Sequence, residues 1–271
     1  MKRVIGALWA FLRRDFAIAR TYRTVFLFEA VEALFGVALL YYVAKFVDSP
    51  QLRGALPTSE SYFAFSLIGF VFLDYLNAGM DAFDRSLMEA RDSGTLEHLL
   101  VTQTSLSGIL AGSALYPFAA ATLRIAIYLG WGAILFHFPL EAANWLAVAA
   151  VLLATLLAFS GLGILSASYL LLFKRGNPAK WFFLGLSSVV GGMLFPITIL
   201  PDWLQVIARL NPVTYALQAM RAALLHGAGF EPVWRPLLVL LLFAAILLPL
   251  SMLVFAWCLR RTKTTGTLMH R

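Results

Sequence analysis

The side chains that most often carry out chemistry are few and scattered in this sequence. The histidines (His98, His137, His226 and His270) lie far apart along the chain, and Cys258 is the single cysteine. No His-Glu-x-x-His or paired-cysteine motif offers a metal site, and no Gly-Lys-Ser or Gly-Lys-Thr offers a nucleotide phosphate site. An enzyme needs several titratable groups that converge on one point. The sequence therefore predicts that this chain is not an enzyme and that it binds no metal, ATP or other cofactor itself.

The composition is typical of a protein whose solvent is lipid. Of the 271 residues, 61% are hydrophobic and 13% are charged, whereas charged residues make up about a quarter of an average soluble domain. The net charge of +7 would suggest nucleic acid if the basic residues shared one soluble face. They lie instead at the ends of apolar segments, so we expect a partner bilayer and no nucleic acid.

Six apolar segments are long enough to cross a bilayer, which takes about 20 residues in a helix. They cover residues 24–47, 62–80, 107–136, 145–173, 181–200 and 237–259. The third and fourth are longer than one crossing requires, which predicts tilt, a kink at Pro117 or a turn that protrudes into water. The predicted fold is all-α, a polytopic membrane protein with six transmembrane helices and both termini on one side.

Lysine and arginine predict which side faces the cytoplasm. Residues 1–23, the interval 84–105, the loop after the fourth span and the tail 260–271 hold 15 of the 21 basic residues. Cytoplasmic loops are enriched in these residues, so we expect a protein of the cell inner membrane with cytoplasmic N- and C-termini. Residues 1–23 also have apolar residues at helical spacing and a basic side. They predict an amphipathic helix in the headgroup plane, or alternatively a positive flank of the first span.

Residues 84–105 form a polar interval between the second and third spans, and their charges predict that they lie outside the hydrocarbon. Leu96, Leu99 and Leu100 recur at the i, i+3, i+4 spacing of one helical face. Asp92-Ser93-Gly94 provides a break and capping groups immediately before that face. The pattern predicts a short docking helix on the cytoplasmic surface. The alternative is an ordinary surface helix between two spans.

Residues 197–227, between the fifth and sixth spans, predict two short amphipathic helices on the external side. Trp203 and Leu210 share one face of the first helix. Asn211-Pro212, a capping residue followed by proline at the first helical position, begins the second. We expect this hairpin to dip into the outer leaflet or to cap a pathway. The alternative is a re-entrant hairpin that only fills space.

Four charged side chains lie inside predicted spans, where an ionised group costs roughly 2.5 to 3.5 kcal/mol. Glu29, Glu32 and Asp74 are predicted at similar depth toward the cytoplasm, in a hydrated vestibule or paired with bases such as Lys180 that reach in from the interface. Arg124 lies well inside the third span, too far from the cytoplasm to meet Asp74 easily if that helix is straight. We expect Arg124 to face the bundle or a transport path, with snorkelling to an interface as the alternative.

Small residues in the fourth and fifth spans predict where helices approach closely. Gly161 and Gly163 lie in the fourth span, and Gly185 lies in the fifth. Glycine lets the backbones of two membrane helices come together. We therefore expect tight helix contacts at these positions.

Two stretches resemble the ABC-2 type permeases, the membrane subunits of ATP-driven exporters. Gly94-Thr95-Leu96-Glu97-His98-Leu99-Leu100-Val101-Thr102 is similar to the family's cytoplasmic coupling segment, which sits in a cleft of the ATPase. Leu200-Pro201-Asp202-Trp203-Leu204, followed by Leu210-Asn211-Pro212-Val213-Thr214-Tyr215 and Arg221, is similar to its most recognisable signature. With the six-span layout, the likeness covers essentially the whole chain.

The resemblance implies a permease homodimer bound to two copies of a separate ABC ATPase, which binds ATP and Mg. The ATPase-coupling residues would be Gly94, Thr95, Leu96, Glu97, Leu99 and Leu100. The external gate would comprise Pro201, Trp203, Asn211, Pro212, Tyr215 and Arg221. The permease would export an amphipathic substrate (a drug, lipid or lipid-linked glycan), and nothing in the sequence chooses among these. The alternative is an ion-coupled carrier or channel that works without an ATPase. A carrier should show inverted repeats or interrupted spans, which we do not detect.

Overall fold

A computed structural model describes residues 23–47, 62–92, 106–141, 143–173, 177–225 and 230–264. Within these residues the regular structure is helical and no strand is present, which confirms the all-α prediction. The elements in chain order are α2 (Arg23–Val47), α3 (Tyr62–Asp92), α5 (Leu106–Phe136), α6 (Trp145–Phe173), α7 (Pro178–Val190), η2 (Ile197–Ile199), α8 (Asp202–Arg209), α9 (Pro212–Leu225) and α10 (Phe230–Thr264).

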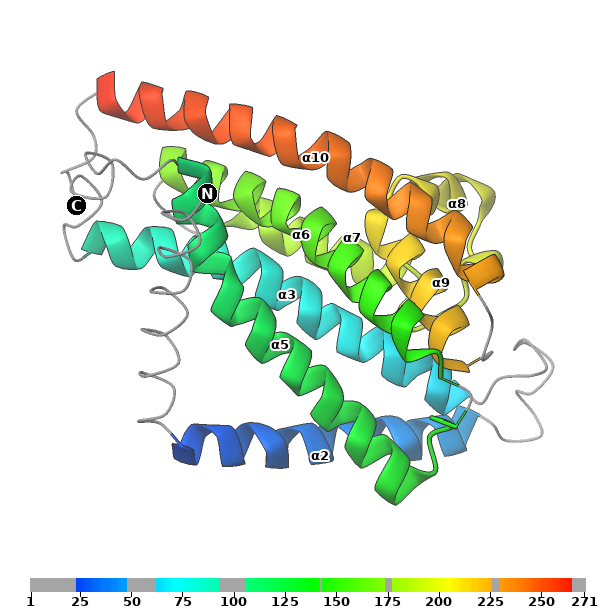
Figure 1. The fold of residues 1–271 in the computed structure, drawn as a ribbon. Helices are drawn as coiled ribbons and strands as arrows, with labels where there is room; N and C mark the ends of the chain where they lie inside the picture. Colours follow the sequence, from blue (N-terminus) through cyan, green and yellow to red (C-terminus); the bar gives the residue numbers. More distant parts are fainter. Residues whose placement is uncertain are drawn as a thin grey trace.

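The described residues include five helices that are long and apolar enough to cross a membrane. Their candidate spans are Leu27–Val47, Tyr62–Met88, Ala114–Phe136, Trp145–Phe173 and Glu231–Thr262, and α7 is a shorter apolar helix. The protein is therefore a multi-pass membrane protein, while the count of six spans stays a prediction. Figure 1 shows these helices arranged lengthwise in one bundle, with α5 crossing obliquely between α2 and the rest.

Helix α3 is the central element of the bundle. It packs against α2, α5, α6, α7 and α9, whereas α10 packs chiefly on α6 and α9. Large apolar side chains of α3 such as Phe72 and Tyr75 are fully buried. Helix α2 presents Phe28, Phe35 and other large apolar side chains outward, as helices that face lipid do.

Helix α3 continues well beyond the predicted span. The sequence predicts a span over 62–80 followed by a polar interval, but α3 runs unbroken to Asp92. Beyond residue 80, Ala82, Phe83 and Asp84 remain buried, so tertiary packing holds this part of the helix in place. Helix α10 is also longer than its predicted span 237–259 and covers Phe230–Thr264. The third predicted span matches α5, which continues through Pro117.

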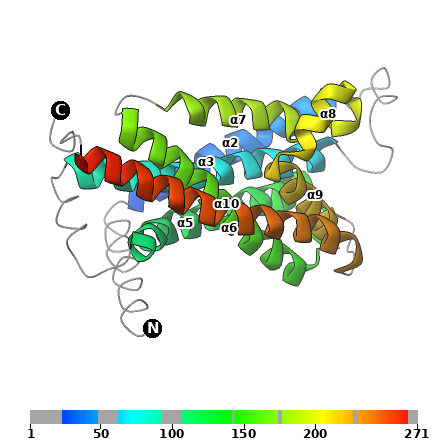
Figure 2. The same cartoon turned by 90° about the horizontal axis from the view of Figure 1, so that it is seen from above.

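The fifth predicted span, 181–200, is shorter in the structure. Helix α7 ends at Val190, and the chain then turns and forms η2 before α8. Gly192 has a φ of +77°, a left-handed conformation that ends a helix and that glycine adopts without strain. Pro196 then fixes its own φ and offers no backbone N–H to a continuing helix. Figure 2 shows α7 running along the bundle toward α8.

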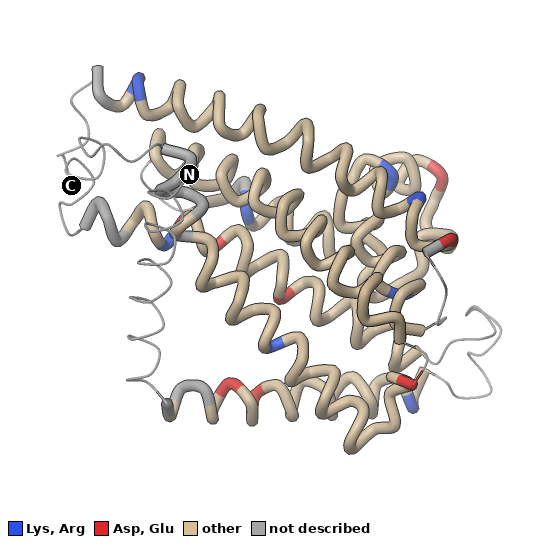
Figure 3. The backbone as a smooth tube through the Cα atoms, viewed as in Figure 1, with Lys and Arg blue, Asp and Glu red and all other residues tan. Residues whose placement is uncertain are grey.

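The two ends of the bundle differ in what they contain. Figure 1 places the start of α2, the end of α3 and the end of α10 at one end, which we call the predicted cytoplasmic end. Helices α8 and α9 lie toward the other end, the predicted external end. Figure 3 shows long uncharged stretches along the helices, with few acidic or basic residues at mid-length. Residues 1–22 and 93–105, with the predicted interfacial and docking helices, lie outside the described residues.

Candidate functional site

Four polar side chains form a stripe along one side of α3. Asp74, Asn77, Asp81 and Asp84 follow the spacing i, i+3, i+7, i+10, which places them on one side of an α-helix. Asp84, which the sequence places in the polar interval 84–105, is only 7% exposed inside the packed part of α3. The stripe brings carboxylates into contact with α5, α6 and α7.

Arg124 of α5 meets Asp74 of α3, contrary to the sequence-based expectation. Its Nε donates to Asp74 Oδ2 at 3.0 Å, and its Nη1 lies 3.9 Å from Glu29 Oε1 of α2. Arg124 is thus an intramembrane base that pairs with two of the three acids, Asp74 and Glu29. Glu32 is exposed on α2 and has no ion pair among the described residues.

The error came from the depth assigned to Asp74. Because α3 runs to Asp92, Asp74 lies 18 residues from the end of α3, and Arg124 lies 18 residues from the start of α5. At ~1.5 Å per residue, both groups are roughly 27 Å along their helices from the connecting segment 93–105. The two side chains therefore lie at the same level. Trp131 adds a second contact between α5 and α2, since its Nε1 donates to the Ala30 carbonyl at 3.1 Å.

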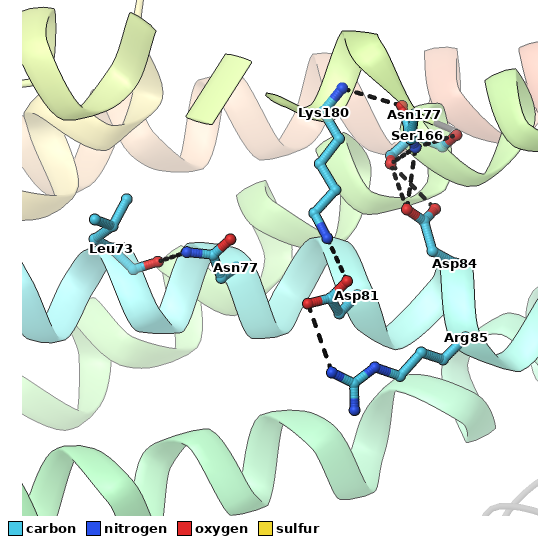
Figure 4. Close-up of polar contacts among 8 residues, drawn as sticks. All are labelled: Leu73, Asn77, Asp81, Asp84, Arg85, Ser166, Asn177 and Lys180. Carbon is cyan, nitrogen blue, oxygen red and sulfur yellow. Dashed lines mark hydrogen bonds and ion pairs between the residues drawn. The ribbon is translucent and has the colours of Figure 1, made fainter. Parts of the chain in front are cut away.

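Asp84 is the centre of a second, buried polar cluster (Figure 4). Ser166 Oγ of α6 donates to Asp84 Oδ1 and Oδ2 at 3.1 and 3.0 Å. Asn177 Nδ2, just before α7, donates to Asp84 Oδ2 at 3.0 Å. Buried charges are stable only when such hydrogen bonds replace water. The cluster joins α3, α6 and α7 near the predicted cytoplasmic end.

Asn177 also caps helix α7. Its Oδ1 accepts a hydrogen bond from the Lys180 backbone N–H at 3.0 Å, and Pro178 takes the first turn of the helix. The Lys180 side chain pairs with Asp81 of α3, one turn from Asp84 (Figure 4). It was expected to reach toward the intramembrane acids, but it binds Asp81. On the other side of Asp81, the exposed Arg85 approaches to 3.8 Å.

Sequence reasoning missed Asp81, Ser166 and Asn177, although two signals were present. One is the stripe spacing that continues from Asp74 along α3. The other is Asn177-Pro178, which repeats the cap-and-proline pattern of Asn211-Pro212. Either signal would have directed attention to the start of α7.

The predicted gate residues fall into two groups, and the structure does not bring them together at one point. Pro201 precedes α8 as its N-cap residue, and Trp203 on α8 is 65% exposed. The others lie on or next to α9. Asn211 Oδ1 accepts from Val213 N at 3.0 Å, and Asn211 Nδ2 donates to Ser187 Oγ of α7 at 3.0 Å. Pro212 is the first residue of α9 and is buried.

Tyr215 and Arg221 fasten α9 to its neighbours. Tyr215 Oη donates to the Arg209 carbonyl at the end of α8, at 2.9 Å. Arg221 Nη2 donates to the Phe65 carbonyl of α3 at 3.1 Å and to the Met193 carbonyl at 3.2 Å. Tyr215 thus connects α9 to the end of α8, and Arg221 connects α9 to α3.

The turn that follows α7 packs directly against Gly69 of α3. A Cβ atom at Gly69 would overlap the Met193 carbonyl oxygen, the same oxygen that accepts from Arg221. Helices α3 and α6 also touch closely, since a Cβ on Gly163 would lie 2.5 Å from the Gly79 carbonyl oxygen. The predicted close approach is thus present at Gly163, whereas a Cβ on Gly185 would meet nothing within 4 Å.

The described residues contain no group of three or more His, Cys, Asp or Glu side chains that could hold a metal ion. The coupling residues Gly94, Thr95, Leu96, Glu97, Leu99 and Leu100 all lie outside the described part of the chain. The described part of the chain contains a set of hydrogen bonds and ion pairs that connect neighbouring helices.

A family comparison decides what kind of membrane protein this is. The model of the ABC-2 type transporter family matches residues 6–225. The chain belongs to the ABC-2 type transporter family. The match includes both polar clusters, the gate residues and the segment 93–105.

Several proteins that this chain is similar to carry permease names. The inner membrane transport permease YadH of Escherichia coli (strain K12) is 26% identical over 165 residues, 59% of this chain and 62% of YadH. The linearmycin resistance permease protein LnrN of Bacillus subtilis (strain 168) is 28% identical over 202 residues, 73% of this chain and 50% of LnrN. The probable multidrug ABC transporter permease YbhR of Escherichia coli (strain K12) is 25% identical over 160 residues, 59% of this chain and 43% of YbhR. The chain therefore matches between 43% and 62% of the length of these relatives.

Proposed function

We propose that this chain is the membrane subunit of an exporter driven by a separate ABC ATPase. The observation that carries the proposal is the family match over residues 6–225. Because these 271 residues include no phosphate-binding loop, the proposal assigns ATP and Mg to another polypeptide. The working assembly would be a permease homodimer with two ATPase copies, in the inner membrane with cytoplasmic termini.

The position of α3 supports an input of force from the cytoplasmic side. The segment 93–105, with the coupling residues, joins the end of α3 to the start of α5. Helix α3 packs against α2, α5, α6, α7 and α9, so a displacement of its end reaches most of the bundle. Closure of the ATPases would push on this segment and move α3 as a rigid body.

The external helices support an exit near α8 and α9. Helix α8 carries the exposed apolar residues Trp203 and Val206, and the exposed Leu210 follows it. Helix α9 is linked to α3 through Arg221. A shift of α3 would therefore move the helices that border the exit. The names of LnrN and YbhR concern linearmycin resistance and multidrug transport. We take an amphipathic drug, lipid or lipid-linked glycan as the substrate class.

Copurification tests this function. The tagged permease is expressed in its native host, and an ABC ATPase is expected to copurify with it. Leu96→Asp and Leu99→Asp should release it, because both side chains lie on the predicted docking face. Thr102→Asp, on another face of the same segment, is the matched control and should retain it. Failure of any ATPase to copurify, with substrate transport in ATP-free vesicles, would favour an ion-coupled carrier.

A further inference from the structure

Five side chains form a contact between α3 and the start of α7, which we call the α3–α7 clasp. They are Asp81, Asp84, Ser166, Asn177 and Lys180. Two separate interactions cross this contact: Asp84 accepts from Asn177, and Asp81 pairs with Lys180. Asn177 and Lys180 belong to the same helical turn, because Asn177 caps α7 through the Lys180 backbone N–H. The end of α3 is therefore bound to the first turn of α7 by one hydrogen bond and one ion pair.

Helix α7 is also held by α3 at its other end. The turn after Val190 places the Met193 carbonyl against Gly69 of α3, where no side chain separates the two backbones. Helix α7 contacts α8 directly, and Ser187 of α7 accepts from Asn211 at the α8–α9 corner. A movement of α3 would thus carry α7 with it and reach α8.

The other side of the bundle has its own joint. Arg124 links α5 to Asp74 of α3 and to Glu29 of α2. None of these three residues belongs to the α3–α7 clasp. Helix α3 is therefore connected to α2 and α5 by one polar joint and to α7 by another.

We infer that the α3–α7 clasp positions α7 so that movement of α3 is passed to α8 during transport. The inference rests on the proposed function, in which the ATPase moves α3. Its residues are positioning residues: they touch neither nucleotide nor substrate in this account. Breaking the clasp should weaken the coupling of α8 to the ATPase, because the contacts of α3 with Met193 and Arg221 remain, while leaving α2 connected through Arg124.

Two reporter cysteines separate these responses. With Cys258 replaced by alanine, Val206→Cys reports on α8 and Phe46→Cys on α2, since Val206 and Phe46 are 57% and 76% exposed. Maleimide labelling is measured on the permease–ATPase complex with and without ATP and vanadate. With an intact clasp, nucleotide should change the labelling rate at both positions.

Asp81→Asn and Lys180→Gln should each reduce the nucleotide response at Val206→Cys and leave it unchanged at Phe46→Cys. Asp81→Asn leaves the largely buried Lys180 ammonium without its partner, so adding Lys180→Gln to it should regain part of the lost response. Arg85→Gln is the matched control, because Arg85 is 76% exposed and lies at the outside of the clasp. It should leave both responses unchanged. Ser166→Ala, a milder change, removes one hydrogen-bond donor to Asp84 and should weaken only the α8 response.

Three results would overturn the inference, and they are distinguishable. A full response at Val206→Cys in both single variants would show that α8 moves without the clasp. Loss of both responses in every clasp variant, Ser166→Ala included, would show that the clasp only maintains the fold. Absence of any response with the clasp intact would overturn the proposed function and the inference with it.

Discussion

Replacing Gly69 by alanine tests the close contact between α3 and the turn that follows α7. The added methyl group would overlap the Met193 carbonyl oxygen. That oxygen belongs to the backbone and also accepts a hydrogen bond from Arg221 at 3.2 Å. It cannot rotate aside as a flexible side chain would, so the turn or α3 itself must shift.

The expected cost follows from two opposing effects. Forcing an extra methyl group into a packed contact costs about 1 to 3 kcal/mol, and a rigid backbone neighbour favours the upper part of that range. Alanine is preferred over glycine inside a helix by roughly 0.5 to 1 kcal/mol, which offsets part of this cost. The net loss of stability should be about 1 to 2 kcal/mol, which corresponds to a roughly 5- to 30-fold rise in the unfolded population.

Cys258 provides the assay, because it is the only cysteine and is buried. In detergent, a thiol-reactive dye labels it only when the protein opens, and the labelling rate follows the open population when reclosing is fast. Gly69→Ala should therefore label faster than the parent protein by the factor given above. Gly130→Ala is the matched control, since a Cβ there would meet nothing within 4 Å. Equal labelling rates for the two variants would refute the close contact at Gly69.

Three further substitutions have defined outcomes. Arg124→Leu leaves the Asp74 and Glu29 carboxylates without their base. Because these side chains are about one-third exposed, the variant should lose at most about 1 kcal/mol of stability. We expect reduced transport-coupled ATP hydrolysis, and unchanged hydrolysis would contradict a role for this contact in transport. Asn211→Ala removes a helix cap and a buried hydrogen bond, so it should cost about 1 to 2 kcal/mol and speed Cys258 labelling. Asn211→Ser, which keeps a capping oxygen and adds no charge at this buried position, should cost less, and equal rates for the two variants would contradict the cap. Gly163→Ala should destabilise the protein, because its Cβ would press on the backbone of α3; Gly185→Ala should not, and equal effects would contradict the contact.

The lengths of the apolar segments predicted the long helices of the fold, because a helix needs about 20 apolar residues to cross the hydrocarbon. The predicted spans 107–136 and 145–173 agree with the bounds of α5 and α6 to within one residue. The Asn211-Pro212 step marks the start of α9 because cap and proline chemistry is local. Such features depend on neighbouring residues in the chain, so the sequence alone is sufficient to place them.

The polar contacts between helices join residues that lie far apart in the sequence, so local sequence patterns did not predict them. Hydropathy ended the second span at residue 80 because Asp81 and Asp84 are charged, yet partners on α6 and α7 stabilise both charges inside the bundle. That shortened span placed Asp74 too near the cytoplasm and hid its pairing with Arg124. Likewise, the end of α7 depends on Gly192 in a left-handed conformation, which average hydrophobicity does not detect.

The account depends on a coupling segment that faces the ATP pool. Thr95, in the segment between α3 and α5, is replaced by cysteine in a background that keeps only the buried Cys258. A membrane-impermeant maleimide is then applied to intact cells and to inverted membrane vesicles. We predict labelling of Thr95→Cys in the inverted vesicles and none in intact cells. Labelling in intact cells would place the segment outside and contradict both the orientation and the proposed coupling to an ATPase.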